Sequence, residues 1–226
     1  MAIAYTQNNH SMVITLSDDG KFGPESLVQM NTALDVVDAD ESITYLLITG
    51  EAKSFSQGFN LEFLGSSQPD EINTFVADAM DMIGRLLALP VPLVSAVNGH
   101  AFGLGAMIVL ASDYAAMRND RGFFCLPEID LGMNLMPSMA VLVNEKLNGT
   151  TLRDVLLTGK RLSGNEAFDA QIVDAACASG ELLTTAQQLV APMLGKQRGA
   201  LHWLKKGINK PILDAIIARE PNPQFL

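Results

Sequence analysis

The chain has 226 residues and a formal net charge of −10; 48% of its residues are hydrophobic and 18% are charged. This composition is typical of a well-packed globular domain and excludes a disordered chain. The acidic balance argues against nucleic acid as a partner, because a protein that binds polyphosphate needs a basic surface. An anionic ligand would therefore require a local basic patch.

The two cysteines, Cys125 and Cys177, are too few for a disulfide framework and indicate free thiols in a reducing compartment. The N-terminus lacks the pattern of a signal peptide, and residues 223–226 are not a peroxisomal address, so a cytoplasmic location is predicted. The stretch between Arg85 and Asp113 has no charged residue, but prolines and an Asn-Gly pair interrupt it. We therefore expect no membrane insertion.

The first half of the chain alternates between strand-like segments and segments of helical periodicity. In chain order, we expect a hairpin of strands 3–7 and 12–16, a helix 24–38, a strand 43–49, a loop 51–64 in which Asn60 caps a short helix, and a long helix capped by Asp70.

The second half becomes mostly helical towards its end. We expect strands at 93–97, 114–117, 122–126 and 172–175, and helices at 106–111, 138–147, 151–157, after the capping box of Ser163 and Glu166, at 181–194 and at 198–219. This order predicts an α/β fold in one domain, 1–226, with a core of about 1–195 and a helical segment of about 196–226. No linker divides the chain.

The chain is organised around one buried strand and the buried helix that follows it. Leu93–Val97 is short and apolar, as in a strand covered on both faces, and Asn98-Gly99 ends it. Gly103 and Gly105 then open the helix at 106–111, which is apolar all round. Such a helix start presents free backbone N–H groups and a positive dipole end, which together can hold negative charge.

The glycine turn is a poor match to a dinucleotide-binding motif. That motif requires a third glycine or an alanine three residues after Gly105, where this chain has Ile108. An alternative stays open in which the glycines serve only the close packing of helix and strand.

A second loop, 54–61, also follows a buried strand. Two such loops can each direct a backbone N–H group at one oxygen, which is the arrangement of an oxyanion hole. Further along, Glu128 is an acid among apolar residues, an environment that raises the pKa of a carboxyl group towards a useful range. These three places predict acid–base chemistry on a substrate that develops negative charge on oxygen.

At these three places the sequence resembles the crotonase superfamily, the enoyl-CoA hydratase and isomerase family. The residues that carry the resemblance are Phe55-Ser56-Gln57-Gly58-Phe59-Asn60-Leu61, Asn98-Gly99-His100-Ala101-Phe102-Gly103-Leu104-Gly105 and Pro127-Glu128. They are similar to the family's Phe-Ser-x-Gly-x-Asp-Leu, Asn-Gly-x-Ala-x-Gly-x-Gly and Pro-Glu signatures, in the same order. The resemblance spans about residues 3–200 and implies a crotonase-like fold of repeated ββα units with a helical C-terminal part.

The resemblance also implies an acyl-CoA substrate and catalytic roles for Gln57, Leu104 and Glu128. The backbone N–H groups of Gln57 and Leu104 would hold the thioester oxygen, and Glu128 would move the proton. Leu104 stands where glycine is common, and Asn60 replaces the usual aspartate. The residues implied to contact substrate are Lys53, which would meet the CoA phosphates, and Ser54, Phe55, Gly58, Phe59, Asn60, Gly103, Met107, Pro127 and Met136.

Met107 is the most informative departure from the family pattern. Hydratases of this family carry a second glutamate there, whereas methionine can neither hold nor activate water. One carboxylate suffices for a double-bond shift, so we expect Δ3,Δ2-enoyl-CoA isomerase chemistry. The alternatives are another crotonase chemistry, such as enoyl-CoA hydratase or acyl-CoA thioesterase, and a non-catalytic acyl-CoA binding protein.

No cofactor is expected beyond the coenzyme A of the substrate, and the three histidines and two cysteines form no metal-binding pattern. His100 is interpreted as a wall residue. Lys205, Lys206 and Lys210 on the last helix either meet CoA phosphates from a neighbouring subunit or form a solvated basic face. The family implies a homotrimer or hexamer. The sequence leaves open the acyl chain length and whether the C-terminal segment closes the site.

Overall fold

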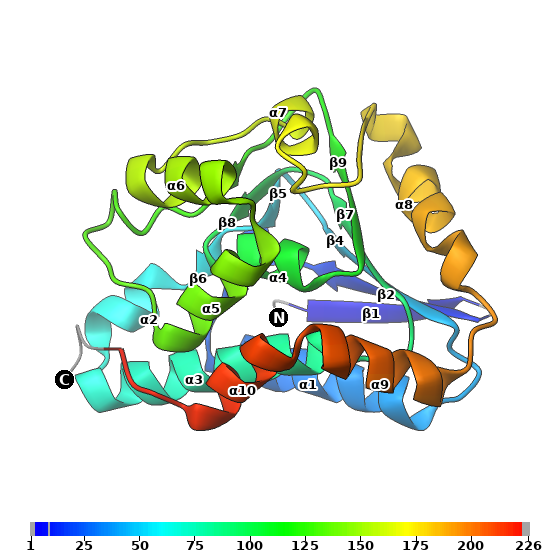
Figure 1. Cartoon of the computed structure of the whole chain (residues 1–226), viewed down its shortest axis with the longest axis horizontal. Helices are drawn as coiled ribbons and strands as arrows, with labels where there is room; N and C mark the ends of the chain where they lie inside the picture. Colours follow the sequence, from blue (N-terminus) through cyan, green and yellow to red (C-terminus); the bar gives the residue numbers. More distant parts are fainter. Residues whose placement is uncertain (1–2, 9, 223–226) are drawn as a thin grey trace.

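The computed structural model describes residues 3–8 and 10–222, and its main sheet has six strands in the order β1-β2-β4-β7-β9-β11 (Figure 1). Smaller sheets have the orders β10-β8-β5 and β3-β6. The strands are β1 Ile3–Asn8, β2 Ser11–Leu16, β3 Lys21–Phe22, β4 Tyr45–Gly50, β5 Ser54–Ser56, β6 Gly58–Phe59, β7 Leu93–Val97, β8 His100–Phe102, β9 Tyr114–Arg118, β10 Phe124–Cys125 and β11 Ala175–Cys177.

The helices surround these sheets. They are α1 Pro24–Ala39, α2 Leu61–Ser66, α3 Pro69–Leu87, α4 Leu104–Ala111, α5 Pro137–Lys146, α6 Gly149–Thr158, α7 Gly164–Asp169, α8 Leu182–Val190, α9 Arg198–Ile208 and α10 Lys210–Ala218. Short 3₁₀ turns occupy Asp18–Gly20, Ser179–Glu181 and Ala191–Met193.

The main sheet separates two apolar clusters. β1 and β2 form the expected antiparallel hairpin, and the pairs from β2 to β11 are parallel. All five residues of β7 are buried because α8 covers one face of the sheet and the large core covers the other (Figure 1). That large core draws residues from Ile3 to Ile216. The sequence-based expectation of a strand covered on both faces is confirmed at β7.

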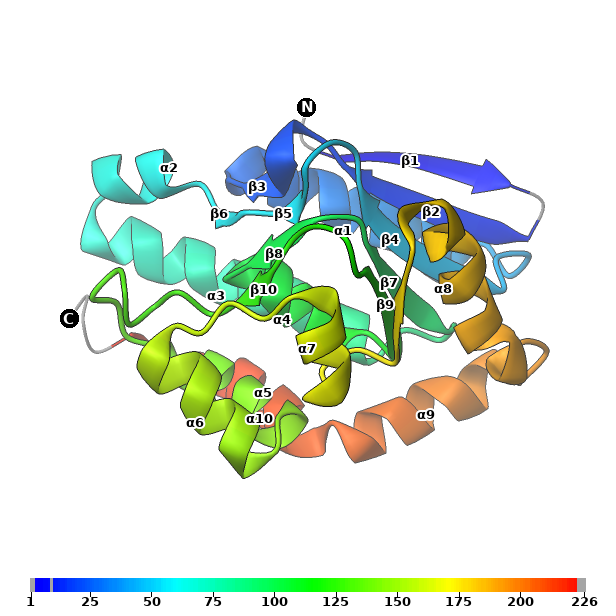
Figure 2. The ribbon, with the colours of Figure 1, turned by 90° about the horizontal axis from the view of Figure 1, so that it is seen from above.

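The three-stranded sheet explains how the sequence motifs meet. β8 lies between β5 and β10, and both pairings are parallel (Figure 2). The carboxyl ends of parallel strands lie at one edge of a sheet, so the turn after β5, the start of α4 after β8 and Glu128 after β10 come together. Neither β5 nor β8 was expected from the sequence, because strands of three residues carry no readable periodicity.

Several expected boundaries were wrong. α3 begins at Pro69, and its N-cap is Gln68 in a capping box with Glu71, so Asp70 lies inside the first turn and caps nothing. β11 begins at Ala175 and not at 172. The expected helix 198–219 is broken at Asn209, whose side chain donates to the carbonyl oxygens of Leu87 and Lys205. Pro211 follows and cannot donate a helical hydrogen bond, which favours a new helix start there.

Candidate active site

A cavity of about 250 Å³ lies where the three motifs meet. Its lining comes from the loop after β5, from α2 and α3, from the start of α4, from the segment after β10 and from the C-terminal segment. The lining residues are Gln57, Phe59, Leu61, Leu64, Ile72, Val76, Phe102, Gly103, Pro127, Glu128, Leu131, Met133, Asn134, Met139, Arg161 and Asn222. More open grooves of about 630 and 580 Å³ lie between surface helices and contain no residue of the motifs.

Glu128 supplies the one carboxyl group among the described lining residues. A tight turn positions it: the N–H groups of Leu131 and Met133 donate to its carbonyl oxygen at 3.2 and 2.9 Å. Its Oε2 is buried and has no hydrogen-bond partner among the described residues. Burial raises the pKa of the Glu128 carboxyl, which its own backbone hydrogen bond only partly offsets. A carboxylate oxygen without a partner in the protein is suited to exchange a proton with a bound ligand.

The N-terminus of α4 borders the same cavity through Gly103. Gly103 has φ +50°, in the left-handed region that favours glycine, and its carbonyl oxygen accepts the first helical hydrogen bond, from Met107 N–H at 3.0 Å. The Leu104 side chain is fully buried, so only its backbone can serve the site. The N–H group of Leu104, as the first residue of the helix, has no acceptor within the helix.

The loop after β5 does not place Gln57 as expected. The Gln57 N–H group donates to the carbonyl oxygen of Asp19 at 2.9 Å, so it is already engaged, and the role expected for Gln57 was wrong. Asn60 N–H donates to Phe22 O at 2.8 Å, towards β3. Because successive N–H groups of a strand point to opposite sides, the Phe59 N–H group points away from β3.

The 58–59 backbone and the start of α4 lie against each other. A Cβ atom on Gly58 would lie 3.1 Å from the Leu104 nitrogen and 2.6 Å from the Phe102 oxygen. Gly58 also has φ +81°. Gly58 thus packs against the start of α4, next to Phe59 and Gly103 of the cavity lining, and this contact requires glycine.

Most of the other expected substrate contacts lie outside the cavity lining. Phe59, Gly103 and Pro127 line it. Phe55, Met107 and Met136 are instead buried in the core, while Lys53 is exposed. The side chains of Ser54 and Asn60 form hydrogen bonds within the fold. The Ser54 hydroxyl accepts from the Gln57 side chain at 2.8 Å. Asn60 caps α2 by accepting from the N–H groups of Glu62 and Phe63, as the sequence predicted.

One basic side chain that was not singled out from the sequence, Arg161, lines the cavity. The Arg161 guanidinium lies 5.6 Å from the centre of the Phe102 ring, is exposed, and forms no ion pair with a described residue. The His100 ring packs 5.0 Å from the Phe102 ring, and its Nδ1 has no partner among the described residues. Burial, followed by Arg161 and Arg121, lowers the pKa of His100. Arg161 and Arg121 therefore form a local basic patch beside His100 in an acidic chain.

The lysines of the last helices do not contribute to that patch. Lys205 is buried, and its ammonium donates to Asp113 Oδ2 at 2.7 Å and to Val91 O at 3.1 Å, so its expected exposure was wrong. Lys210 pairs with Asp214 one turn away. Lys206 lies 5.0 Å over the Trp203 ring.

The family model described as enoyl-CoA hydratase/isomerase matches residues 7–220. The chain belongs to the enoyl-CoA hydratase/isomerase family. Its fold is accordingly the crotonase fold, as the motifs predicted. No helix in the part of the chain that the structure describes is long and apolar enough to cross a membrane.

Two named proteins of Arabidopsis thaliana are similar to this chain. Enoyl-CoA delta isomerase 3 is 32% identical over 200 residues, which cover 85% of this chain and 82% of the relative. The peroxisomal enoyl-CoA delta isomerase 2 is 30% identical and is covered to the same 82%. A Mycobacterium tuberculosis structure described as a probable enoyl-CoA hydratase superposes with a TM-score of 0.89 at 24% identity, covering 96% of this chain and 92% of its own.

Proposed function

We propose that this family member shifts the double bond of a 3-enoyl-CoA to the 2-position through an enolate. The observation that carries the proposal is Glu128, whose buried Oε2 has no hydrogen-bond partner among the described residues, in a cavity whose described lining has no second Asp or Glu. The names of the Arabidopsis relatives, enoyl-CoA delta isomerases, support the same reaction.

The reaction needs one proton carrier and one site for negative charge. Glu128 removes a proton from C2, and the electron pair moves into the thioester carbonyl, whose oxygen becomes an enolate. The N–H groups of Phe59 and Leu104, at the positive end of α4, stabilise that oxygen. Glu128 then returns the proton to C4, and the double bond now joins C2 and C3. The proton count is balanced without water or any other reactant.

Hydration is disfavoured by the same lining. Met107 occupies the position of the second family glutamate, is 1% exposed and does not face the cavity. A water molecule would therefore lack the second carboxylate that holds it in hydratases. Thioester hydrolysis through an acyl-serine, acyl-threonine or acyl-cysteine intermediate is disfavoured because the described lining has no serine, threonine or cysteine.

A direct comparison of two substrates tests this proposal. With a 3-enoyl-CoA, we expect the absorbance of a conjugated 2-enoyl thioester to appear. With a 2-enoyl-CoA, we expect the rate of 3-hydroxyacyl-CoA formation to be at least about 100-fold lower, the usual contribution of one acid–base group. Hydration faster than isomerisation would make the protein a hydratase, and binding without either product would make it an acyl-CoA binding protein.

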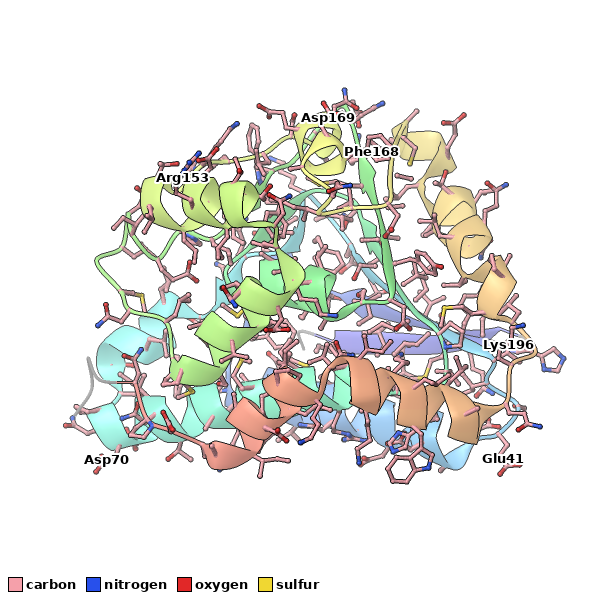
Figure 3. All side chains as sticks on the ribbon, viewed as in Figure 1. Glu41, Asp70, Arg153, Phe168, Asp169 and Lys196 are labelled. Carbon is pink, nitrogen blue, oxygen red and sulfur yellow. The ribbon has the colours of Figure 1, made fainter. Side chains whose placement is uncertain are left out.

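The basic patch of Arg161 and Arg121 is proposed to hold the CoA phosphates, in place of the lysines of the last helices. For Arg161→Ala we expect KM for the CoA ester to rise about tenfold with kcat little changed, since a charge-assisted hydrogen bond contributes about 1.5–3 kcal/mol. The control is Arg153→Ala on α6, whose side chain points away from the molecule and pairs with Asp154 (Figure 3). Steady-state kinetics at low and high salt check it; an equal effect of both variants would contradict the assignment.

The homotrimer or hexamer and the cytoplasmic location stay predictions. A surface on α9 and α10 fits the former: Trp203, Leu204, Ile208 and Ile217 are each at least 66% exposed, and such apolar surfaces are typical of subunit interfaces. Two of the Arabidopsis relatives are named as peroxisomal, whereas a cytoplasmic location is predicted for this chain.

A further inference from the structure

The C-terminal segment forms part of the cavity wall. Asn222 is 4% exposed and lines the cavity although it lies 94 positions after Glu128 in the chain. Its neighbours in the wall, Ile72 and Val76 of α3 and Met133 and Met139 around the start of α5, are apolar. The cavity thus combines an apolar wall with an amide group brought in from the end of the described chain.

Arg219 directs the chain onto α3. It ends α10 in the left-handed conformation, with φ +49°, which reverses the chain. Its guanidinium pairs with Asp78 at 2.7 Å and with Asp81, both on α3. Figure 1 shows the chain leaving α10 beside α3 and running towards α2.

Asn222 anchors residues 220–222 at their other end. Its N–H group donates to Asn73 Oδ1 at 3.2 Å, and its Nδ2 donates to the carbonyl oxygen of Asn134 at 3.0 Å. Asn73 precedes Asp78 by five helical residues, about 7.5 Å along the axis. Three extended residues span at most about 10 Å, so residues 220–222 reach between the two anchors with little slack.

We propose that Asn222 limits the length of the acyl chain that this cavity accepts. This rests on the proposed function, in which the cavity holds the acyl group of a CoA thioester. At about 250 Å³ the cavity lies below the roughly 300–1,000 Å³ of most ligand pockets, so it accepts only a short acyl group. A longer chain would have to displace Asn222 and break its hydrogen bonds to Asn73 and Asn134, which costs the buried Asn222 its hydrogen-bond partners.

The substrate class is therefore CoA esters of acyl chains short enough to end before Asn222. The test measures kcat/KM for 3-enoyl-CoA esters of six, eight, ten and twelve carbons. It also measures dissociation constants of the saturated acyl-CoA esters of the same lengths by calorimetry. The binding series reports the length limit even if the protein lacks isomerase activity, so failure of the proposed function and failure of this inference give different results.

Two substitutions of Asn222 change the space left for the acyl chain in opposite directions. Asn222→Ala should raise the ratio of ten-carbon to six-carbon substrate, in kcat/KM and in binding, by roughly tenfold or more, since one methylene changes discrimination by about 10–200-fold. Asn222→Phe should lower it. Lys210→Ala, at an exposed ion pair of the same segment, is the control and should leave the ratio unchanged. A uniform loss at all chain lengths in both variants, or a wild-type preference for twelve carbons, would overturn the inference.

Discussion

Glu128→Gln is expected to reduce isomerisation at least about 1,000-fold, within the 10²–10⁴-fold range of general acid–base catalysis, because one group performs both proton transfers. Glutamine has nearly the same shape but exchanges no proton. The dissociation constant for a saturated acyl-CoA should change little, since no described residue pairs with the Oε2 that is replaced. Progress curves at saturating 3-enoyl-CoA, together with calorimetric binding, measure both quantities.

Asp130→Asn provides the matched control for this variant. Asp130 lies two positions after Glu128, is exposed and does not line the cavity. Its loss should leave the rate within about threefold, as is usual for an exposed carboxylate away from the site. Full activity of Glu128→Gln, or an equal loss in Asp130→Asn, would remove Glu128 from the mechanism.

The same carboxyl group sets the expected pH dependence. Glu128 must be ionised to accept the C2 proton, so kcat/KM should fall as the pH is lowered through its raised pKa. The folded protein holds this proton at a pH where the unfolded chain has lost it. Folding stability from this group therefore decreases as the pH rises from the ordinary carboxyl pKa through the raised one. Glu128→Gln should lose that dependence in thermal unfolding.

Gly58→Ala is expected to lower kcat about 100-fold, the lower end of the effect of removing one oxyanion-hole donor. The added Cβ would lie 2.6 Å from the Phe102 oxygen, closer than a carbon atom tolerates, and 3.1 Å from the Leu104 nitrogen, which is a tight contact. The positive φ of Gly58 adds backbone strain. β6 would have to shift away from α4, which separates the Phe59 and Leu104 N–H groups.

Gly65→Ala controls for the loss of a glycine in the same region. Gly65 lies in α2, and a Cβ there would have no heavy atom within 4 Å. Kinetics of both variants, with circular dichroism to compare folding, distinguish a local shift from unfolding. Unchanged kcat in a folded Gly58→Ala protein would contradict the placement of the oxyanion hole.

Elements with strong periodicity could be predicted from the sequence. The β1–β2 hairpin, α1, β7 and α4 lie within a few residues of where apolar spacing placed them. β5 and β8 have three residues each and β10 has two, and they are defined by pairing with segments far away in the chain. Local sequence carries little information on such pairing, so the convergence of the three motifs was implied by family resemblance and not by periodicity.

The residues of the candidate site also differ in whether the sequence could identify them. Glu128 could be identified because a carboxyl group among apolar residues is chemically unusual. The choice between Gln57 and Phe59 could not be made, because it depends on which N–H group is taken by Asp19 and which faces the cavity. Wall residues such as Val76 and Asn222 carry no catalytic signal and reach the site only through packing.

The most direct test of the account adds purified protein to a 3-enoyl-CoA in deuterated water. We expect the absorbance of the conjugated 2-enoyl thioester to appear, and Glu128→Gln to lose it. We also expect deuterium at C2 or C4 wherever the proton held by Glu128 exchanges with solvent before it is returned, and Glu128→Gln to lose this signal too. Binding of the CoA ester with neither conjugated product nor deuterium at C2 would contradict the account, because the enolate would then not form in this site.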